Sequence, residues 1–385
     1  MHTVIVGGGF AGIRAALEIS KRQLGKITLI SDQPNFIHHA TMYSTLTGHD
    51  KAESVISLED IFASHHDVKI VIDTMTSVDP DRRLAVCKKR SYSYDSLLLA
   101  LGSTSNFFDV KGAARHTLGV NNLKDIDTFH SHIKNEILHD KHLDKNYVIV
   151  GGGTTGVEIA GALAKYLKDL SVQYLTKRAR VNVSIAELQP RLLPYYSKTA
   201  THKITARLKS LGVEIHTSAS VTKIDGHHAI ISGKRIPTET VIWTSGSMNN
   251  PFYSRNKAYF QLAENGRVVV NPYLEAYRDI YILGDNVDTA HAGTAQAAID
   301  MADFVAAHLL RKVTDKPLKA FRGKKHAISV PVGDDWAYVE SHGIYIDGKL
   351  GHFVRRYLEL RSYRKLLTPN MARVAWKSHN RNTTL

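Results

Sequence analysis

The sequence predicts an α/β protein with two Rossmann-like domains, because a buried strand, a glycine-rich turn and a helix follow one another at two places in the chain. The length agrees with this prediction, since 385 residues correspond to two to three domains of about 150 residues each. Hydrophobic residues make up 43% of the chain and charged residues 22%, which is typical of globular proteins. No stretch approaches about 18 consecutive apolar residues, so we expect no membrane-spanning helix.

The first strand–turn–helix unit opens the chain. The apolar run at residues 3–6 is followed by GGGFAG and then by a helix-forming segment. Three glycines match the pattern G-x-G-x-x-G: Gly7, Gly9 and Gly12. The first glycine of this pattern permits a tight turn, the second lets a pyrophosphate approach the backbone, and the third lets helix and strand pack closely. We expect the phosphates at the helix N-terminus, where free N–H groups and the helix dipole favour negative charge.

An acidic residue near the end of the next strand can accept the ribose hydroxyls of such a nucleotide. The segment KITLIS predicts this strand, which ends at Ser31. Asp32 follows directly and lies 25 residues after Gly7. We therefore expect Ser31 and Asp32 beside the ribose.

The second unit begins at residues 147–150, which are followed by GGGTTG and another helix-forming segment. Its glycines match the same pattern: Gly151, Gly153 and Gly156. The two glycine turns start 144 residues apart, which is too far for a solenoid repeat. The next strand ends at Glu187, 36 residues beyond Gly151, so the helix must be extended or followed by an insertion. A carboxylate there binds an unphosphorylated ribose and repels a 2′-phosphate, which favours NADH over NADPH.

Two dinucleotide sites in one chain indicate electron transfer between two cofactors, usually a bound flavin and a diffusing nicotinamide. Cys87 is the single cysteine, which excludes an internal disulfide, a cysteine-based zinc site and a redox-active dithiol. We expect it in an exposed hairpin without a redox role. Among the 21 histidines, adjacent pairs such as His38 and His39 point apart, and no H-E-x-x-H motif occurs, so we predict no metal site.

Three further segments resemble flavoproteins that have two dinucleotide-binding domains. These segments are residues 94–108, 238–246 and 265–288. The first resembles the strand and turn that close a flavin domain, with Gly102 in the turn, and the second resembles the corresponding NADH-domain turn, with Gly246 at its end. The third resembles the late flavin motif, in which Gly284 and Asp285 reach the ribityl and phosphate region. Within this superfamily, a single cysteine excludes the mechanisms of disulfide reductases and sulfide:quinone reductases.

More specifically, the chain resembles type II NADH dehydrogenases, which are single-chain NADH:quinone oxidoreductases. GGGTTGVEIAG matches the second glycine motif of that family, including its glutamate, here Glu158, whereas the glutamate of the following AGE sequence is Ala162 here. Residues 292–302 resemble the quinone-site helix of the family, A-Q-x-A-x-Q-x-G. Ala295, Gln296 and Ala298 fit this motif, whereas Asp300 and Ala302 stand where the family has Gln and Gly.

This resemblance implies a bound FAD, a diffusing NADH and a quinone acceptor. It implies that Glu158 handles protons or orients NADH, and that Gln296 uses its amide near the flavin or the quinone carbonyl. The alternatives are that Glu158 only complements the helix dipole and that Gln296 caps neighbouring backbone. The residues expected at FAD are Gly7, Gly9, Phe10, Ala11, Gly12, Ser31, Asp32, Met75, Gly102, Gly284, Asp285, Ala295 and Gln296. The residues expected at NADH are Gly151, Gly153, Thr155, Gly156, Glu187 and Gly246.

The C-terminal region predicts short strands and then a basic amphipathic helix. Its apolar residues have helical spacing: Leu350, Phe353, Val354, Tyr357 and Leu358. Basic residues such as Arg355 and Arg356 occupy the remaining positions, Pro369 should end the helix, and Trp376 should lie at a membrane interface. Residues 311–385 hold 16 Lys and Arg against 6 Asp and Glu, whereas the whole chain has a net charge of +14.

Such a helix can lie among anionic lipid headgroups. The alternative is that its apolar face packs on the flavin domain or on a second subunit, which would make a homodimer. We expect no nucleic-acid partner, because no RNP, zinc or helix-turn-helix signature accompanies the charge.

These observations predict an FAD-binding domain (residues 1–115 and 265–325), an NADH-binding domain (residues 116–264) and a C-terminal membrane-association or dimerisation region (residues 326–385). The expected protein is a non-proton-pumping NADH:quinone oxidoreductase, peripheral on the cytoplasmic face of the cell membrane. One alternative is a soluble NADH-dependent reductase of ferredoxin, rubredoxin or oxygen, which the departures at Asp300 and Ala302 favour. A second alternative is a non-enzymatic sensor that binds FAD and NADH.

Overall fold

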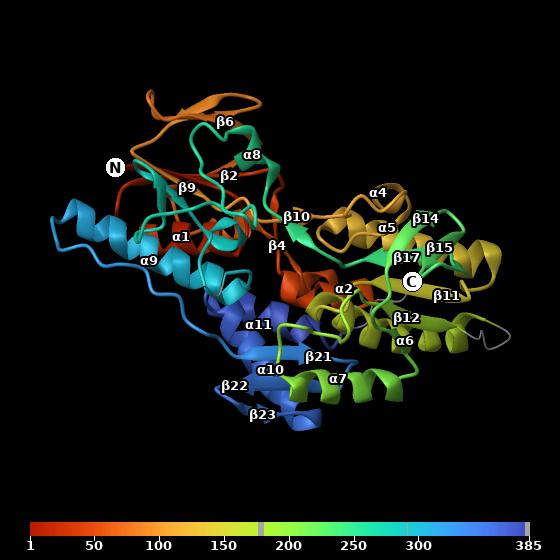
Figure 1. Ribbon diagram of the computed structural model, residues 1–385. Helices are drawn as coiled ribbons and strands as arrows, with labels where there is room; N and C mark the ends of the chain where they lie inside the picture. Colours follow the sequence, from red (N-terminus) through yellow and green to blue (C-terminus); the bar gives the residue numbers. More distant parts are fainter. Residues whose placement is uncertain (176–180, 291, 382–385) are drawn as a thin grey trace.

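The computed structural model describes residues 1–175, 181–290 and 292–381, and it contains two parallel sheets and a C-terminal unit (Figure 1). The first sheet has six strands in the order β19–β20–β9–β1–β2–β5. Their bounds are β1 (His2–Val6), β2 (Lys26–Ser31), β5 (Val68–Ile72), β9 (Ser96–Leu99), β19 (Glu275–Tyr277) and β20 (Ile280–Ile282). Neighbouring strands are parallel except β19 and β20. The predicted α/β fold is thus confirmed for the first half.

Elements on both faces cover this sheet, which explains why β1 and β9 are mostly apolar and almost entirely buried. Helices α1 (Phe10–Lys21) and α9 (Ala295–Val313) pack against each other on one face, and the antiparallel sheet of β6, β7 and β8 lies on the other (Figure 1). The remaining bounds are β6 (Met75–Asp79), β7 (Leu84–Cys87), β8 (Ser91–Ser93), α3 (Leu58–Phe62) and α8 (Pro251–Arg255). The predicted hairpin around Cys87 is present, but the prediction of exposure was wrong. Cys87 is buried, and burial raises the pKa of its thiol to about 12.

The second sheet has four parallel strands in the order β13–β12–β11–β17. Their bounds are β11 (Asn146–Val150), β12 (Asn182–Ala186), β13 (Glu214–His216) and β17 (Thr240–Trp243). The neighbouring elements are α4 (Ala113–His116), α5 (Leu123–Asn135), the π-turn η3 (Glu136–Asp140), α6 (Thr154–Tyr174), α7 (Lys198–Ser210), β14 (Val221–Asp225), β15 (His228–Ile231) and β16 (Lys234–Pro237). Of the two explanations for the spacing to Glu187, an extended helix or an insertion after it, the 21 residues of α6 confirm the extended helix.

The chain crosses between the two sheets twice, and the two crossings pair as an antiparallel ribbon. Its strands are β10 (Thr104–Ser105) and β18 (Ser247–Met248), which Figure 1 places between the two halves of the molecule. A second link is the segment that extends from the first sheet towards α6. It contains β3 (Asn35–Ile37), η1 (His39–Thr41), α2 (Met42–Leu46), η2 (Lys51–Glu53) and β4 (Val55–Ser57), and α2 contacts α6.

The C-terminal unit contains the predicted short strands and two helices. They are β21 (Ile328–Pro331), β22 (Ala337–Ser341), β23 (Ile344–Ile346), α10 (Gly348–Tyr363) and α11 (Pro369–Ser378). Two predictions about this unit were wrong. Pro369 begins α11, because proline fits the first helical turn, and α10 has already ended at Tyr363. Trp376 packs inward, where its ring lies 4.9 Å from the Arg356 guanidinium and its Nε1–H donates to the Arg356 carbonyl.

Candidate functional site

The first glycine turn leaves an open space at the N-terminus of α1. Gly12 packs so closely that a Cβ atom there would lie 1.9 Å from the carbonyl oxygen of Gly7, so only glycine fits. A Cβ atom on Gly9 would meet no described atom within 4 Å, and Gly9 caps α1 without a side-chain hydrogen bond. The first N–H groups of α1, at Phe10 and Ala11, can therefore bind an anion. The turn fits a dinucleotide pyrophosphate.

Ser31 and Asp32 lie next to this turn, at the carboxyl end of β2. Ser31 is buried, and its hydroxyl donates to the carbonyl of Gln33 at 2.8 Å. A Cβ atom on Gly8 would lie 2.7 Å from the Ser31 hydroxyl, which places Ser31 against the glycine turn. Asp32 is exposed. Met75 is buried at the start of β6, shortly after Asp73, whose N–H donates to the carbonyl of Ser31 at 2.9 Å.

The second glycine turn repeats the geometry of the first. A Cβ atom on Gly156 would lie 2.0 Å from the Gly151 carbonyl oxygen, whereas one on Gly153 would meet no atom within 4 Å in the described ranges. Glu187 follows β12 and lies against this turn, because its carboxylate accepts the N–H of Gly152 at 2.6 Å and that of Gln189 at 2.7 Å. Thr155 is exposed in the first turn of α6. The arrangement fits a second dinucleotide with its ribose near Glu187.

The turns at Gly102 and Gly284 are joined by hydrogen bonds that the sequence did not predict. Asn286, which is fully buried, donates from Nδ2 to the carbonyl of Gly102 at 2.9 Å and to Oδ1 of Asn249 at 2.5 Å. The hydroxyl of Ser103 donates to Oδ2 of Asp285 at 3.3 Å. The structure thus joins the turn at Gly102, which was expected to close the flavin domain, to the loop that was expected to reach the ribityl and phosphate region. Asn286 directly follows the G-D pair of the late motif, which is the one signal that could have revealed it.

At the N-terminus of α9, Gln296 uses its amide within the protein. Thr294 caps the helix by accepting the N–H of Ala297, and Ala295 begins it. The Gln296 Nε2 atom donates to Oδ1 of Asp300 at 2.9 Å. The other carboxylate oxygen of Asp300 lies 3.0 Å from His326 Nε2, which is an ion-pair distance without hydrogen-bond geometry. Asp300, which departs from the family motif, therefore accepts a hydrogen bond from the amide of Gln296, which fits the motif.

Glu158 lies at the N-terminal end of α6 in surroundings that favour its protonated form. Burial of the carboxyl group raises its pKa to about 7, and the nearby Arg355 partly opposes this shift. Arg355 comes from α10 and is buried, and it donates to the carbonyl of Ala40 at 2.8 Å. Glu158 in turn contributes to raising the pKa of Tyr196, after burial. A carboxyl group with this pKa can gain or lose a proton near neutral pH.

His38 was missed by the sequence predictions and lies beside the first glycine turn. Its ring is 5.2 Å from that of Phe10 and stacks on Tyr363 of α10 at 4.3 Å. Nδ1 lies 3.0 Å from the Thr41 hydroxyl, whereas the buried Nε2 atom has no hydrogen-bond partner in the described part of the chain. Burial lowers the pKa of His38 to about 3, so the ring is neutral at physiological pH. No local motif marks this residue, because the aromatic rings that it contacts, those of Phe10 and Tyr363, come from other segments of the chain.

Helix α10 exposes several apolar side chains and buries two arginines. Leu350, Phe353 and Tyr357 are 61%, 71% and 59% exposed. Arg355 and Arg356 are buried, which corrects the prediction that they belong to the solvated basic side. In β23, Ile344 and its two neighbours are also exposed and extend the apolar surface. Among the described residues, no helix is long and apolar enough to cross a membrane.

Curated proteins of similar sequence cover nearly the whole chain. The type II NADH:quinone oxidoreductase of Staphylococcus epidermidis is 23% identical over 394 residues, with 94% of this chain and 95% of the relative covered. That of Staphylococcus aureus is 23% identical over 385 residues, with the same coverage.

Solved structures show the same fold. NDH2 from Plasmodium falciparum in complex with NADH has a TM-score of 0.88 and 16% identity, and the match covers 98% of this chain and 97% of that one. The sulfide:quinone oxidoreductase of Aquifex aeolicus has a TM-score of 0.81 and 18% identity, with 96% and 92% covered. Residues 1–302 match the family described as pyridine nucleotide-disulphide oxidoreductase. Because this match spans more than three quarters of the sequence, the chain belongs to the pyridine nucleotide-disulphide oxidoreductase family.

Proposed function

We propose that the protein is an FAD-containing NADH:quinone oxidoreductase that passes electrons from NADH to a membrane quinone without pumping protons. The observation that carries this proposal is the pair of open glycine turns, each between the first strand and the first helix of its own parallel sheet. Such a pair accommodates two dinucleotides in one chain. The names of the staphylococcal relatives, which match this chain along nearly its whole length, support the quinone as the acceptor.

The two glycine turns and Glu187 have distinct tasks in this proposal. FAD, when bound, supplies the two-electron carrier between NADH and the quinone. The turn from Gly7 to Gly12 and the N-terminus of α1 hold its pyrophosphate. The turn from Gly151 to Gly156 holds that of NADH, and the charge of Glu187 selects an unphosphorylated ribose.

Reduction of a quinone consumes two protons, and Glu158 is the proposed donor. Because its pKa is raised to about 7, the carboxyl group of Glu158 is protonated in a large share of the protein molecules at neutral pH. Gln296 is the proposed contact to the quinone carbonyl, since its hydrogen bond to Asp300 leaves the second amide hydrogen of Gln296 available to donate.

An anaerobic absorbance titration tests both halves of this reaction. NADH should bleach the flavin band of the purified protein, and a short-chain quinone should restore it. Gly12→Ala should abolish FAD retention because its Cβ atom meets the Gly7 carbonyl, whereas Gly226→Ala, at an uncrowded turn, should retain FAD. Bleaching without restoration by quinone would favour a protein acceptor such as ferredoxin. Failure to bind FAD after reconstitution would contradict the proposal altogether.

We further propose that the C-terminal region attaches the protein to the cytoplasmic face of an anionic membrane. The apolar side chains exposed on α10 and β23 can enter the headgroup layer. Arg361, in the last turn of α10, and Arg364, directly after the helix, are exposed and can bind lipid phosphates. The proposed regions remain residues 1–115 with 265–325 for FAD, 116–264 for NADH and 326–385 for attachment.

A further inference from the structure

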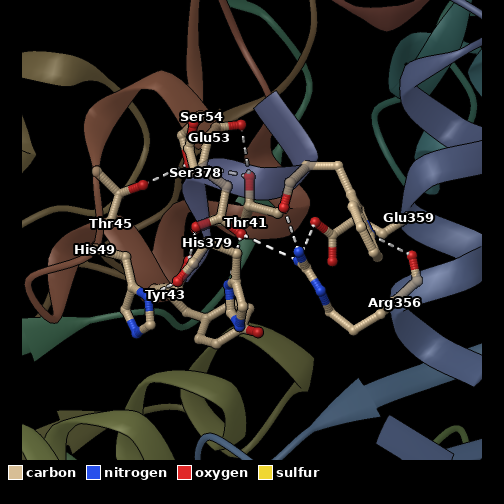
Figure 2. Close-up of polar contacts among 12 residues, drawn as sticks. Thr41, Tyr43, Thr45, His49, Glu53, Ser54, Arg356, Glu359, Ser378 and His379 are labelled. Carbon is tan, nitrogen blue, oxygen red and sulfur yellow. Dashed lines mark hydrogen bonds and ion pairs between the residues drawn. The ribbon is translucent and has the colours of Figure 1, made fainter. Parts of the chain in front are cut away.

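Two polar groups lie outside the glycine turns, and the first of them binds only itself. It is the buried cluster where α10 and α11 pack on residues 41–54 (Figure 2). The hydroxyl of Ser44 donates to one carboxylate oxygen of Glu53 at 2.7 Å, and Nδ1 of His379 lies 2.8 Å from the other. Nδ1 of His49 lies 2.6 Å from the His379 carbonyl. These contacts hold the C-terminal helices against the first half of the chain.

The second group is a row of three polar side chains at the start of α9. Gln296 and Asp300 are four residues apart and therefore lie on the same face of the helix. Nε2 of Gln296 donates to Oδ1 of Asp300 at 2.9 Å, and Oδ2 of Asp300 lies 3.0 Å from Nε2 of His326. His326 belongs to the segment between α9 and β21. The row thus links this segment to the amide that is proposed to meet the quinone.

Positive groups from two other elements lie near Asp300. Lys365, just after α10, is close enough for the charges of Asp300 and Asp303 to oppose the fall in its pKa that burial causes. Arg14, on α1, donates to the carboxylate of Asp303 at 2.5 Å and to the carbonyl of Lys365 at 2.8 Å. These groups attract the carboxylate of Asp300 and hold it beside the start of α9.

Asp300 decides which end of the Gln296 amide faces it. An ionised carboxylate only accepts hydrogen bonds, so the NH₂ group of Gln296 must turn towards Asp300. An amide side chain at position 300 would instead pair with Gln296 in either direction, because each amide both donates and accepts. The second N–H of Gln296 and its Oε1 atom have no hydrogen-bond partner within residues 1–175, 181–290 and 292–381. The amide therefore offers one donor and one acceptor in a fixed arrangement.

We propose that Asp300, supported by His326, is a positioning residue that orients the Gln296 amide towards the quinone. This inference rests on the proposed function, in which Gln296 contacts the quinone. The free N–H of Gln296 suits the carbonyl of the oxidised quinone, which only accepts. Its Oε1 atom suits the hydroxyl of the reduced product, which can donate. The same fixed amide can thus bind both forms without turning over.

Equilibrium binding of duroquinone to the FAD-loaded full chain, without NADH, tests this role. Quenching of protein and flavin fluorescence measures the Kd. Gln296→Ala and Asp300→Leu should each raise the Kd about two- to tenfold, as expected for one hydrogen bond. Asp300→Asn should recover part of the affinity, because its amide accepts in only one of its two pairings. Asp315→Asn, at an exposed position just after α9, is the control and should leave the Kd unchanged.

A double-mutant cycle separates positioning from a general structural effect. If Asp300 acts through the amide, Asp300→Leu should change the Kd no further once Gln296 is alanine. His326→Gln should raise the Kd about twofold, since a partly exposed ion pair contributes little. FAD absorbance and thermal unfolding verify that each variant is folded.

Two results would overturn the inference and leave the proposed reaction intact. One is an additive effect of Asp300→Leu and Gln296→Ala, which would show that Asp300 acts independently of the amide. The other is an unchanged Kd in Asp300→Leu or in Gln296→Ala while quinone still restores the flavin band. Absence of duroquinone binding to the native chain, together with no restoration of the flavin band, would contradict the proposed function and this inference with it.

Discussion

Glu158 combines a location at the start of α6 with a pKa of about 7, and the combination has a measurable consequence. If its carboxyl group donates protons, quinone reduction should slow as the pH rises through about 7, because the proton is lost there. Glu158→Gln should lower the rate of this step about 10²-fold or more at pH 7 and abolish the pH dependence. NADH oxidation by the flavin should be unchanged.

Stopped-flow absorbance measures the two steps separately. Asp169→Asn, on the exposed side of the same helix, is the control and should leave both steps unchanged. A quinone step whose pH profile survives Glu158→Gln would show that another group donates the protons.

Nucleotide selection depends on one carboxylate. Glu187 is held by the N–H groups of Gly152 and Gln189, so its charge stands at the second glycine turn. Glu187→Gln should raise the KM for NADH about tenfold or more, since hydrogen bonds to charged groups contribute about 1.5–3 kcal/mol. It should also improve the relative use of NADPH, because the repulsion of a 2′-phosphate is removed.

Steady-state kinetics with both nucleotides test this prediction. Glu214→Gln, at the exposed start of β13, should change neither KM. Unaltered preference in Glu187→Gln would exclude Glu187 from ribose recognition.

At the scale of elements, sequence patterns predicted features whose contacts lie within a few residues. They missed features whose contacts come from distant parts of the sequence. The glycine turns were predictable because each residue's constraint lies within a few positions, as the close approach of Gly12 to Gly7 illustrates. The burial of the two arginines of α10 was not predictable. The groups that they contact, the Ala40 carbonyl and the Glu53 carboxylate, lie about 300 residues earlier in the sequence. For the same reason, adjacent histidine pairs gave no hint of a cluster that joins His49 to His379.

The exposed apolar face of α10 leads to a prediction about membrane attachment. Replacing Leu350 and Phe353 by Ser should reduce binding to vesicles that contain anionic lipid about tenfold or more, since each buried side chain contributes about 1.5–3 kcal/mol. Turnover with a short-chain soluble quinone should remain at the native level.

Vesicle sedimentation measures this binding. Val172→Ser, at an exposed apolar position on α6, is the control. Unchanged sedimentation together with a loss of dimer in light scattering would instead assign this face to a second copy of the chain.

For the whole molecule, buried ionisable groups make stability depend on pH. His38 has a pKa of about 3 in the folded chain against 6.5 for free histidine, so the unfolded chain binds the extra proton between these values. The contribution of neutral His38 is complete above pH 6.5 and is lost as the pH falls towards 3. Glu158 acts in the opposite direction, because its raised pKa favours folding most below pH 4.5 and less as the pH rises through about 7.

Comparison of the native chain with His38→Gln isolates the first effect. The difference between their free energies of unfolding should shrink by about 1.4 kcal/mol per pH unit as the pH falls from 6 to 4. Denaturant unfolding at several pH values measures it, and His142→Gln, at an exposed site, should show no such trend. A constant difference would mean that His38 is protonated in the folded protein.

The ribbon of β10 and β18 also determines the order in which the molecule can form during synthesis. Strand β9 leaves the ribosome early, but its neighbour β20 and the helix α9 that covers α1 follow only after the second sheet is complete. Until β20 is synthesised, the first sheet therefore has an unpaired edge at β9. The second sheet can complete its strand pairing before then. The half that is translated first should reach its native state last, and until then its exposed edge is the part of the nascent chain most open to chaperones.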